Sequence, residues 1–299
     1  MYTTRLQKTV PGKTTSFSLL LIVLISFQFS CQKKYIGPEV SYGTNFNLLL
    51  KMVVSSGSGI TTHTFTYDGN GLVSSRNILL RGNNPSRTEN ALEQYYRNTS
   101  GYIDSIKIVS SLNGVVSGIK KIYFSYNNGG QVAYSVLRYN TNDASSAVDS
   151  AVYQYDGNFL IQRNDYIASG TGAYTSTPAR QLIYQYSGKN ISNLIFQNTV
   201  TTGGTAQQQT TLISYNYDTS KAALPINGFQ YGYSGIGFAY HEYAANHNLQ
   251  TIKYGDGASV EGASYSYTYL IMGKPYKASL TETSATGSST TSTIEFFYD

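Results

Sequence analysis

The sequence contains one cysteine, no tryptophan and few charged residues. Because Cys31 is the only cysteine, an intramolecular disulfide is excluded, even in a compartment that would permit one. Charged residues make up 12% of the chain, whereas Tyr occurs 29 times and Gly 28 times. The chain is poor in the Ala, Leu, Glu and Lys that favour helices. This composition predicts extended strands joined by tight polar turns.

The first thirty residues have the features of an export signal. Three basic residues, Arg5, Lys8 and Lys13, precede an apolar run from Phe17 to Phe27, and no acidic residue occurs before Cys31. The run is shorter than the ~20 apolar residues of a membrane-spanning helix, but it matches the core of a signal peptide. Ser30 is the small residue expected before cleavage, and Cys31 follows it directly. We therefore predict residues 1–30 to be a lipoprotein signal peptide and Cys31 to be lipidated.

The flanks of Cys31 bear on where the protein is held. Gln28 stands where the usual lipoprotein motif has Leu or Val, so the site resembles the relaxed form of that motif. Gln32 does not match the aspartate rule for retention in the inner membrane, which predicts an outer-membrane protein facing the periplasm or the cell surface. Two or three acyl chains, palmitate among them, would anchor it stably. Residues 31–45 are mostly polar and predict a lipidated N-terminus and tether.

Charge gives no indication of a nucleic-acid partner. The chain has 21 basic and 16 acidic residues, and three of the basic ones precede Cys31. The remaining chain therefore carries 18 basic against 16 acidic residues, a net charge of +2. Nucleic-acid binding is not expected at that balance.

An internal repeat organises residues 46–299, which we predict to form one β domain. An aromatic-x-Tyr pair followed by a polar turn recurs, as in Phe65-Thr66-Tyr67-Asp68-Gly69 and Tyr153-Gln154-Tyr155-Asp156-Gly157. Further copies lie at 124–126, 184–186 and 215–217, with weaker ones at 95–96, 265–267 and 296–298. The second aromatic residues, at 67, 96, 126, 155, 186 and 217, are 29 to 31 residues apart. A regular period of this kind indicates a repeat architecture.

Each repeat predicts two strands. Residues two apart share a face of a strand, so the aromatic pair lies on one face, with neutral polar residues on the other: Thr66, Ser125, Gln154, Gln185, Asn216 and Ser266. Eight such units give an antiparallel meander of roughly sixteen strands. A sheet of that length twists and leaves exposed edges, which favours curling into a barrel or half-barrel.

The Tyr-Asp-x-x-Gly turns resemble the YD repeats of RHS-type shell proteins. The longer period, the signal peptide and the terminal aromatic strand more closely resemble a family of uncharacterised bacterial lipoproteins, a domain of unknown function described as having a porin-like β fold. Both resemblances imply a fold for residues 46–299 and no catalytic residue. A membrane-spanning barrel is not expected, because return strands carry Asp104, Lys107, Arg138, Arg163 and Asp165 where spanning strands need an unbroken apolar face.

Candidate chemistry is sparse. Asp68, Asp156 and Asp218 could act as paired carboxylates on a glycoside, but they share one turn position of successive repeats, which turn geometry explains. The repeat breaks over 225–254, which predicts an irregular crossover or short helix. His241, Glu242 and His247 there are weak candidates for metal ligands, because His241 and His247 would be ~20 Å apart on one strand. No catalytic residue or cofactor is predicted.

The sequence thus predicts a non-enzymatic cell-envelope lipoprotein that serves as a binding or structural scaffold. Its expected partners are the membrane, through the lipid anchor, and a glycan, an apolar ligand or an envelope protein. Two alternatives remain open: a glycan-active enzyme using acids near 241–256, and an RHS-like shell around a partner.

Overall fold

The computed structural model describes residues 48–83, 87–139, 147–167, 176–202, 205–221, 247–255, 261–271 and 273–299. These residues form sixteen β-strands, and no helix occurs among them. The described residues therefore contain no helix that is long and apolar enough to cross a membrane. The strands are β1 (Leu49–Ser56), β2 (Gly59–Tyr67), β3 (Val73–Gly82), β4 (Thr88–Arg97), β5 (Ile103–Leu112), β6 (Val115–Tyr126), β7 (Val132–Tyr139), β8 (Ala147–Asp156), β9 (Phe159–Ile167), β10 (Arg180–Ser187), β11 (Asn190–Thr202), β12 (Thr205–Lys221), β13 (His247–Tyr254), β14 (Gly262–Tyr269), β15 (Pro275–Thr283) and β16 (Ser289–Tyr298).

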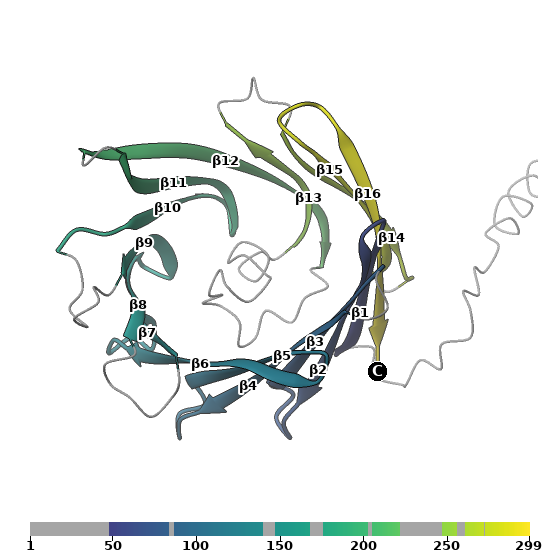
Figure 1. Ribbon diagram of the computed structural model, residues 1–299, viewed down its shortest axis with the longest axis horizontal. Coiled ribbons are helices and arrows are strands. Elements are labelled where there is room, and N and C mark those ends of the chain that lie inside the picture. Colours follow the sequence, from purple (N-terminus) through teal and green to yellow (C-terminus); the bar gives the residue numbers. More distant parts are fainter. Residues whose placement is uncertain are drawn as a thin grey trace, which may run out of the picture. The chain divides into compact units, whose positions relative to one another are not determined.

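The strands form one closed antiparallel barrel (Figure 1). Each strand pairs with its neighbours in sequence, and β16 pairs with β1 to close the ring. The predicted all-β meander of sixteen strands is confirmed, and of the two predicted shapes the closed barrel is the observed one. Closure removes the free edges at which an open sheet of this length would pair with other chains.

The two faces of the sheet differ as the repeat predicts. The first aromatic residue of most repeats is buried, as for Phe65, Tyr153 and Tyr215, whereas Tyr265 is half-buried. The intervening neutral residues are all exposed: Thr66, Ser125, Gln154, Gln185, Asn216 and Ser266. Within the described part of the chain, only the inner face of a closed sheet has other side chains to pack against. We therefore assign the aromatic face to the inside of the barrel and the neutral face to the outside.

Three of the turns that join even to odd strands share one hydrogen-bonding scheme, whereas the turns 157–158 and 188–189 are two-residue hairpins. In the turn 68–72, the Asp68 N–H donates to the Leu72 carbonyl, and Asp68 Oδ1 accepts from the N–H groups of Asn70 and Leu72. Asn98 and Asn127 make the same bonds in the turns 98–102 and 127–131. Gly71, Gly101 and Gly130 adopt positive φ in these turns, which glycine tolerates best. Asp68 therefore has a structural role in its turn.

One copy of the repeat differs from the prediction by one residue. Tyr95 is buried and Tyr96 is 45% exposed, so Tyr96 faces outward and cannot be the second inward aromatic residue. Arg97 occupies that position, since it pairs with Ile103 as Tyr126 pairs with Val132. The marker positions are thus 67, 97, 126, 155, 186 and 217.

Tyrosine hydroxyls link neighbouring repeats at one end of the barrel. The hydroxyls of Tyr67, Tyr126, Tyr186, Tyr267 and Tyr298 donate to the carbonyls of Leu49, Ile103, Leu160, Leu249 and Pro275, at 2.5–2.9 Å. Arg97 Nη2 donates to the Val73 carbonyl in the same way, at 3.2 Å. Each acceptor lies at or near the start of an odd-numbered strand. The repeated tyrosine therefore supplies both a ring for the core and a donor for an adjoining backbone.

Where β16 meets β1, two residues far apart in the sequence, Leu48 and Asp299, form the hydrogen bonds of the repeated turn. The Asp299 N–H donates to the Leu48 carbonyl, and the Leu48 N–H donates to Asp299 Oδ1, as Asp68 and Leu72 do in their continuous turn. Tyr298 pairs with Leu49 as Tyr67 pairs with Val73. The barrel is thus closed by the geometry that builds its hairpins.

Asp218 and Asn248 also form the hydrogen bonds of this turn, although residues 219–247 separate them in the sequence. Asp218 Oδ1 accepts from the N–H groups of Ser220 and Asn248, which correspond to Asn70 and Leu72. Asp218 Oδ2 also accepts from Asn248 Nδ2 and from the Tyr269 hydroxyl. The irregular segment predicted over 225–254 is shorter than expected at its end, because 247–254 forms β13, and 222–246 lies outside the described residues.

Candidate functional site

The two ends of the barrel have different connections. At the tight-turn end, which we define by the turns 68–72, 98–102, 127–131, 157–158, 188–189 and 270–274, the chain also enters β1 and leaves β16. The long connection 222–246 joins β12 to β13 at this same end. At the loop end, short hairpins at 57–58 and 113–114 alternate with longer connections such as 83–87 and 168–179. Loops on a rigid scaffold commonly carry function, which makes the inward-facing side chains near the loop end candidates for a functional site.

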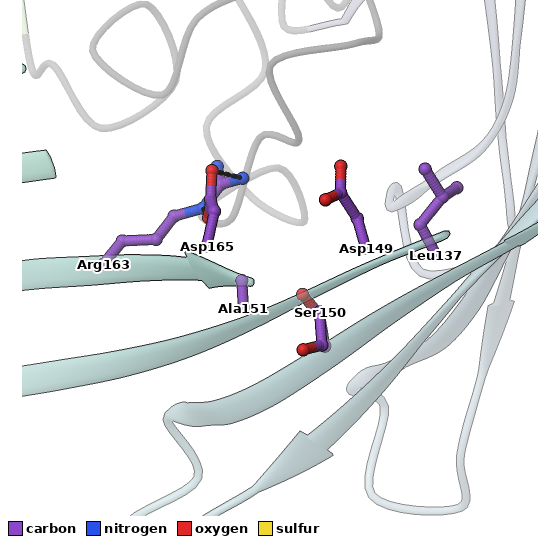
Figure 2. A pocket seen from close by; sticks show the side chains of 7 residues that line it. Leu137, Asp149, Ser150, Ala151, Arg163 and Asp165 are labelled. Carbon is purple, nitrogen blue, oxygen red and sulfur yellow. Dashed lines mark hydrogen bonds and ion pairs between the residues drawn. The ribbon is translucent and has the colours of Figure 1, made fainter. Parts of the chain in front are cut away.

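An ion-pair cluster of Asp149, Arg163, Asp165 and Arg180 lies on the inner face of β8, β9 and β10. Arg163 Nε and Nη2 donate to the two carboxylate oxygens of Asp165, at 2.6 and 3.1 Å. Arg180 Nη2 lies 3.2 Å from Asp149 Oδ2, and Arg180 Nε lies 3.4 Å from Asp165 Oδ2. Figure 2 shows Asp149 on the same side of the sheet as Arg163 and Asp165, with Ser150 on the other side. The two positive charges are thus balanced by two negative charges.

Burial fixes the protonation of the groups around this cluster. Burial would lower the pKa of Arg163, but Tyr153 and Asp165 outweigh it and raise that pKa above its usual value. Burial raises the pKa of Tyr153 and of Tyr184, which keeps both phenols neutral. The Tyr153 hydroxyl oxygen lies 3.0 Å from Ser135 Oγ. Arg163 is therefore charged and both phenols are neutral, and the bonds of Arg163 and Arg180 to the two carboxylates hold the wall together.

Three residues of the cluster, Asp149, Arg163 and Asp165, line a small hollow. Its other lining residues are Ser135, Leu137, Ser150 and Ala151. Its space of about 180 Å³ includes open solvent, and its enclosed part has no room even for a water molecule. Sites for small organic ligands are commonly ~300–1,000 Å³. This hollow is therefore too small to be a binding pocket for a ligand of that size.

A second inward ion pair joins β3 to β4. Arg76 Nε and Nη2 donate to the carboxylate of Glu93 at 2.8 and 2.7 Å, and the Tyr95 hydroxyl donates to Glu93 Oε2 at 2.6 Å. Burial raises the pKa of Glu93, although its bonds from Arg76 and Tyr95 lower it. Burial, followed by the charge of Arg76, lowers the pKa of His63 to about 3. His63 is therefore neutral at physiological pH and is not poised for acid–base chemistry.

Five exposed apolar side chains form what we call the apolar rim, on the inward-facing rows next to the loop end. They extend over the arc from β3 to β9: Leu80 (37% exposed), Leu112 (42%), Val115 (72%), Tyr139 (40%) and Ile167 (45%). The strand pairing places them on one face, because Leu80 pairs with Glu89, Glu89 with Leu112, and Leu112 with Val115. Tyr139 and Ile167 pair with Lys120 and Asp149, which continue the same inward rows. Apolar and charged residues thus alternate along the rim.

The residues predicted for lipidation and metal binding fall mostly outside the described part of the chain. Cys31, His241 and Glu242 lie there, as does the tether over 31–45, and these remain predictions. His247 begins β13, and its Nδ1 lies 2.9 Å from Asn190 Nδ2. Among the described residues, no three His, Cys, Asp or Glu side chains are grouped closely enough to hold a metal ion.

Sequence reasoning missed the ion-pair cluster and the apolar rim. Arg163 and Asp165 are two residues apart, so their shared face could have been read from the strand period. Arg76 and Glu93 lie on different strands, and only the register of β3 on β4 brings them together. The rim depends in the same way on the register of seven strands.

Among solved structures, a porin-like protein has a fold similar to that of this barrel. The structure is similar to a porin-like protein from Bacteroides uniformis, with a TM-score of 0.54, 13% sequence identity, and 84% of this chain and 98% of that chain covered. At that identity the similarity supports the fold alone.

Two further similarities are too weak to support an argument about this chain. A porin-like protein from Bacteroides vulgatus has a TM-score of 0.38 and 13% identity, over 84% of this chain and 98% of that chain. The Tc holotoxin pore of Photorhabdus luminescens has a TM-score of 0.26 and 8% identity, over 76% of this chain and 15% of that chain. No protein-family model matches the sequence, and no curated protein matches it.

Proposed function

We propose that this protein is a non-enzymatic lipoprotein of the outer membrane, anchored through Cys31, whose barrel stands outside the bilayer and binds an envelope protein at the apolar rim. The observation that carries the binding role is the rim itself, with five apolar side chains left 37–72% exposed. Exposed apolar residues gathered along one edge and bordered by charged groups are characteristic of interaction surfaces.

The outer face supports a barrel in water. A membrane-spanning barrel presents an apolar band ~25 Å tall. Leu92, Val109 and Ile119 do form an outward apolar row, but the adjacent row is Gln94, Lys107 and Lys121. Elsewhere neutral side chains bond to one another across the outer face, as Asn216 does with Thr251 and Gln181 with Asn164. An outer face of this composition is suited to contact with water.

The rim favours a protein partner over a small apolar ligand or a glycan. Its apolar residues alternate with Glu89, Lys120 and Asp149, so a partner would have to meet both apolar and charged groups. A partner polypeptide can match such a row, whereas a small ligand needs an enclosed pocket. The hollow beside the rim, at about 180 Å³, does not provide one for a ligand of usual size.

Site-specific photo-crosslinking in cells tests this proposal. A photoreactive amino acid replaces Val115 in the rim, and in a matched control it replaces Gln154, which is exposed on the outer face. We expect a discrete crosslinked protein from position 115 and none from position 154. Crosslinks at position 154 of equal yield, or none at position 115, would show that the rim is not the binding surface.

A further inference from the structure

The tight-turn end differs from the loop end in how it relates to the predicted anchor. Leu48 is bonded to Asp299 at this end, and Cys31 precedes Leu48 by 17 residues. The predicted tether therefore joins the barrel at this end. The loop end lies farther from Leu48 by the length of a tilted strand of about ten residues, roughly 25 Å. The tight-turn end is therefore the end that the anchor holds nearest to the lipid.

One turn at this end is unusually apolar. The turn 270–274 has the backbone bonds of the other turns, from the Leu270 N–H to the Lys274 carbonyl and from the Gly273 N–H to the Leu270 carbonyl. The corresponding turns begin with Asp68, Asn98 or Asn127, whose side chains cap them. Here the sequence is Leu-Ile-Met. Leu270 packs against the core, but Ile271 is 99% exposed.

Turn geometry does not explain Ile271. The polar turns form the same bonds with Gly69, Thr99 or Asn128 at the corresponding position, so an apolar residue is not needed for folding. A fully exposed isoleucine at the tip of a turn loses no protein contact by entering an apolar medium, and its transfer from water is favourable.

Aromatic residues accompany Ile271 at the same end. Tyr102 is 43% exposed and stacks on Tyr126, with ring centroids 5.0 Å apart. Phe159 is 39% exposed and lies against Tyr186 at 4.8 Å. Aromatic side chains, and tyrosine in particular, are favoured at the boundary between lipid and water.

From these features we infer that the tight-turn end of the barrel rests on the lipid bilayer, with Ile271 inserted among the lipids and Tyr102 and Phe159 at the interface. This orientation rests on the proposed lipidation of Cys31. It leaves the apolar rim at the opposite end, directed away from the anchoring membrane. The protein would thus hold its partner-binding surface at a distance of one barrel length from the bilayer.

The absence of tryptophan makes this orientation directly measurable. The full-length lipidated protein is reconstituted in vesicles of phosphatidylethanolamine and phosphatidylglycerol that contain dibrominated phosphatidylcholine, which quenches tryptophan near acyl chains. Ile271→Trp places the only tryptophan at the tight-turn end. Val115→Trp, also at an exposed turn-proximal position, places it at the loop end and is the matched control.

Flotation of the wild-type protein and of Cys31→Ser with the vesicles is measured first. If the wild type floats and Cys31→Ser does not, the anchor is established, and several-fold stronger quenching of Ile271→Trp than of Val115→Trp is expected. Equal quenching, or stronger quenching of Val115→Trp, would overturn the orientation while leaving the anchor intact. If the wild-type protein does not float, the anchored function fails, and the orientation fails with it.

Discussion

Tyrosine serves two purposes in each repeat, and the two are separable by substitution. The ring of Tyr126 lies against the core, while its hydroxyl donates to the Ile103 carbonyl. Phenylalanine would keep the ring and lose the donor. This dual use gives a physical reason why the repeat places tyrosine at its second aromatic position.

We expect Tyr126→Phe to reduce the free energy of unfolding by ~0.5–1.5 kcal/mol, the usual value of one hydrogen bond. Chemical denaturation monitored by circular dichroism measures the change. Tyr96→Phe is the control, because the Tyr96 side chain is 45% exposed on the outer face. An equal loss of stability in both variants would show that the carbonyl bonds do not hold the repeats together.

His63 makes stability depend on pH. Burial lowers its pKa to about 3 from 6.5 in the unfolded chain. Between these values the unfolded chain binds the proton and the folded chain does not. Protonation of His63 therefore favours unfolding, and the free energy of unfolding is highest above pH 6.5 and decreases as the pH falls. Through His63, the free energy of unfolding of the parent should fall by about 2–3 kcal/mol between pH 7 and pH 4.5, and His63→Leu should lack this decrease.

Denaturation curves recorded over that pH range provide the measurement for His63. His247→Leu serves as the control, since His247 lies at the start of β13 and is only partly buried. A parent and a His63→Leu variant with parallel pH profiles would mean that His63 is protonated in the folded barrel.

At the scale of the element, the two-strand unit could be predicted from the sequence almost completely. The repeat predicts a second strand after each turn, and β7 and β9 are two such strands. Alternation of buried and exposed residues, with glycine at positive φ in the turns, carries enough local information for this. The prediction at Tyr96 was wrong because Tyr95 and Tyr96 are adjacent, so either of them could be taken as the inward-facing residue. Only the pairing of β4 with β5 shows which one faces inward.

The closing turn between Asp299 and Leu48 predicts a circular permutant. Joining Asp299 to Leu48 through Gly-Asn-Gly, the residues at 69–71, would restore the continuous turn, and new termini can be opened between Asn113 and Gly114. We expect the permutant to fold with the parental circular dichroism spectrum and to melt within a few degrees of the parent. The same opening without the joining linker is the control, and we expect two fragments that associate less stably than the permutant. A permutant that fails to fold would show that the closing turn does not act as a hairpin turn.

For the whole molecule, closure was only one of two predicted shapes, because nothing local distinguishes a barrel from a curled sheet. The bonds between β1 and β16 join residues about 250 apart in the sequence, such as Leu48 and Asp299. The candidate sites are equally non-local. The ion-pair cluster and the apolar rim come from registers across several strands, which composition and spacing do not reveal.

The central claim is that this sixteen-stranded barrel keeps its aromatic face inside and its neutral face in water. The most direct test is to express residues 32–299, without Cys31, and to measure the mass of the product in detergent-free buffer by light scattering after size exclusion. The account predicts a soluble, monodisperse β-protein. A product that requires detergent to stay dispersed would contradict it, since that would place the outer face of the barrel in lipid.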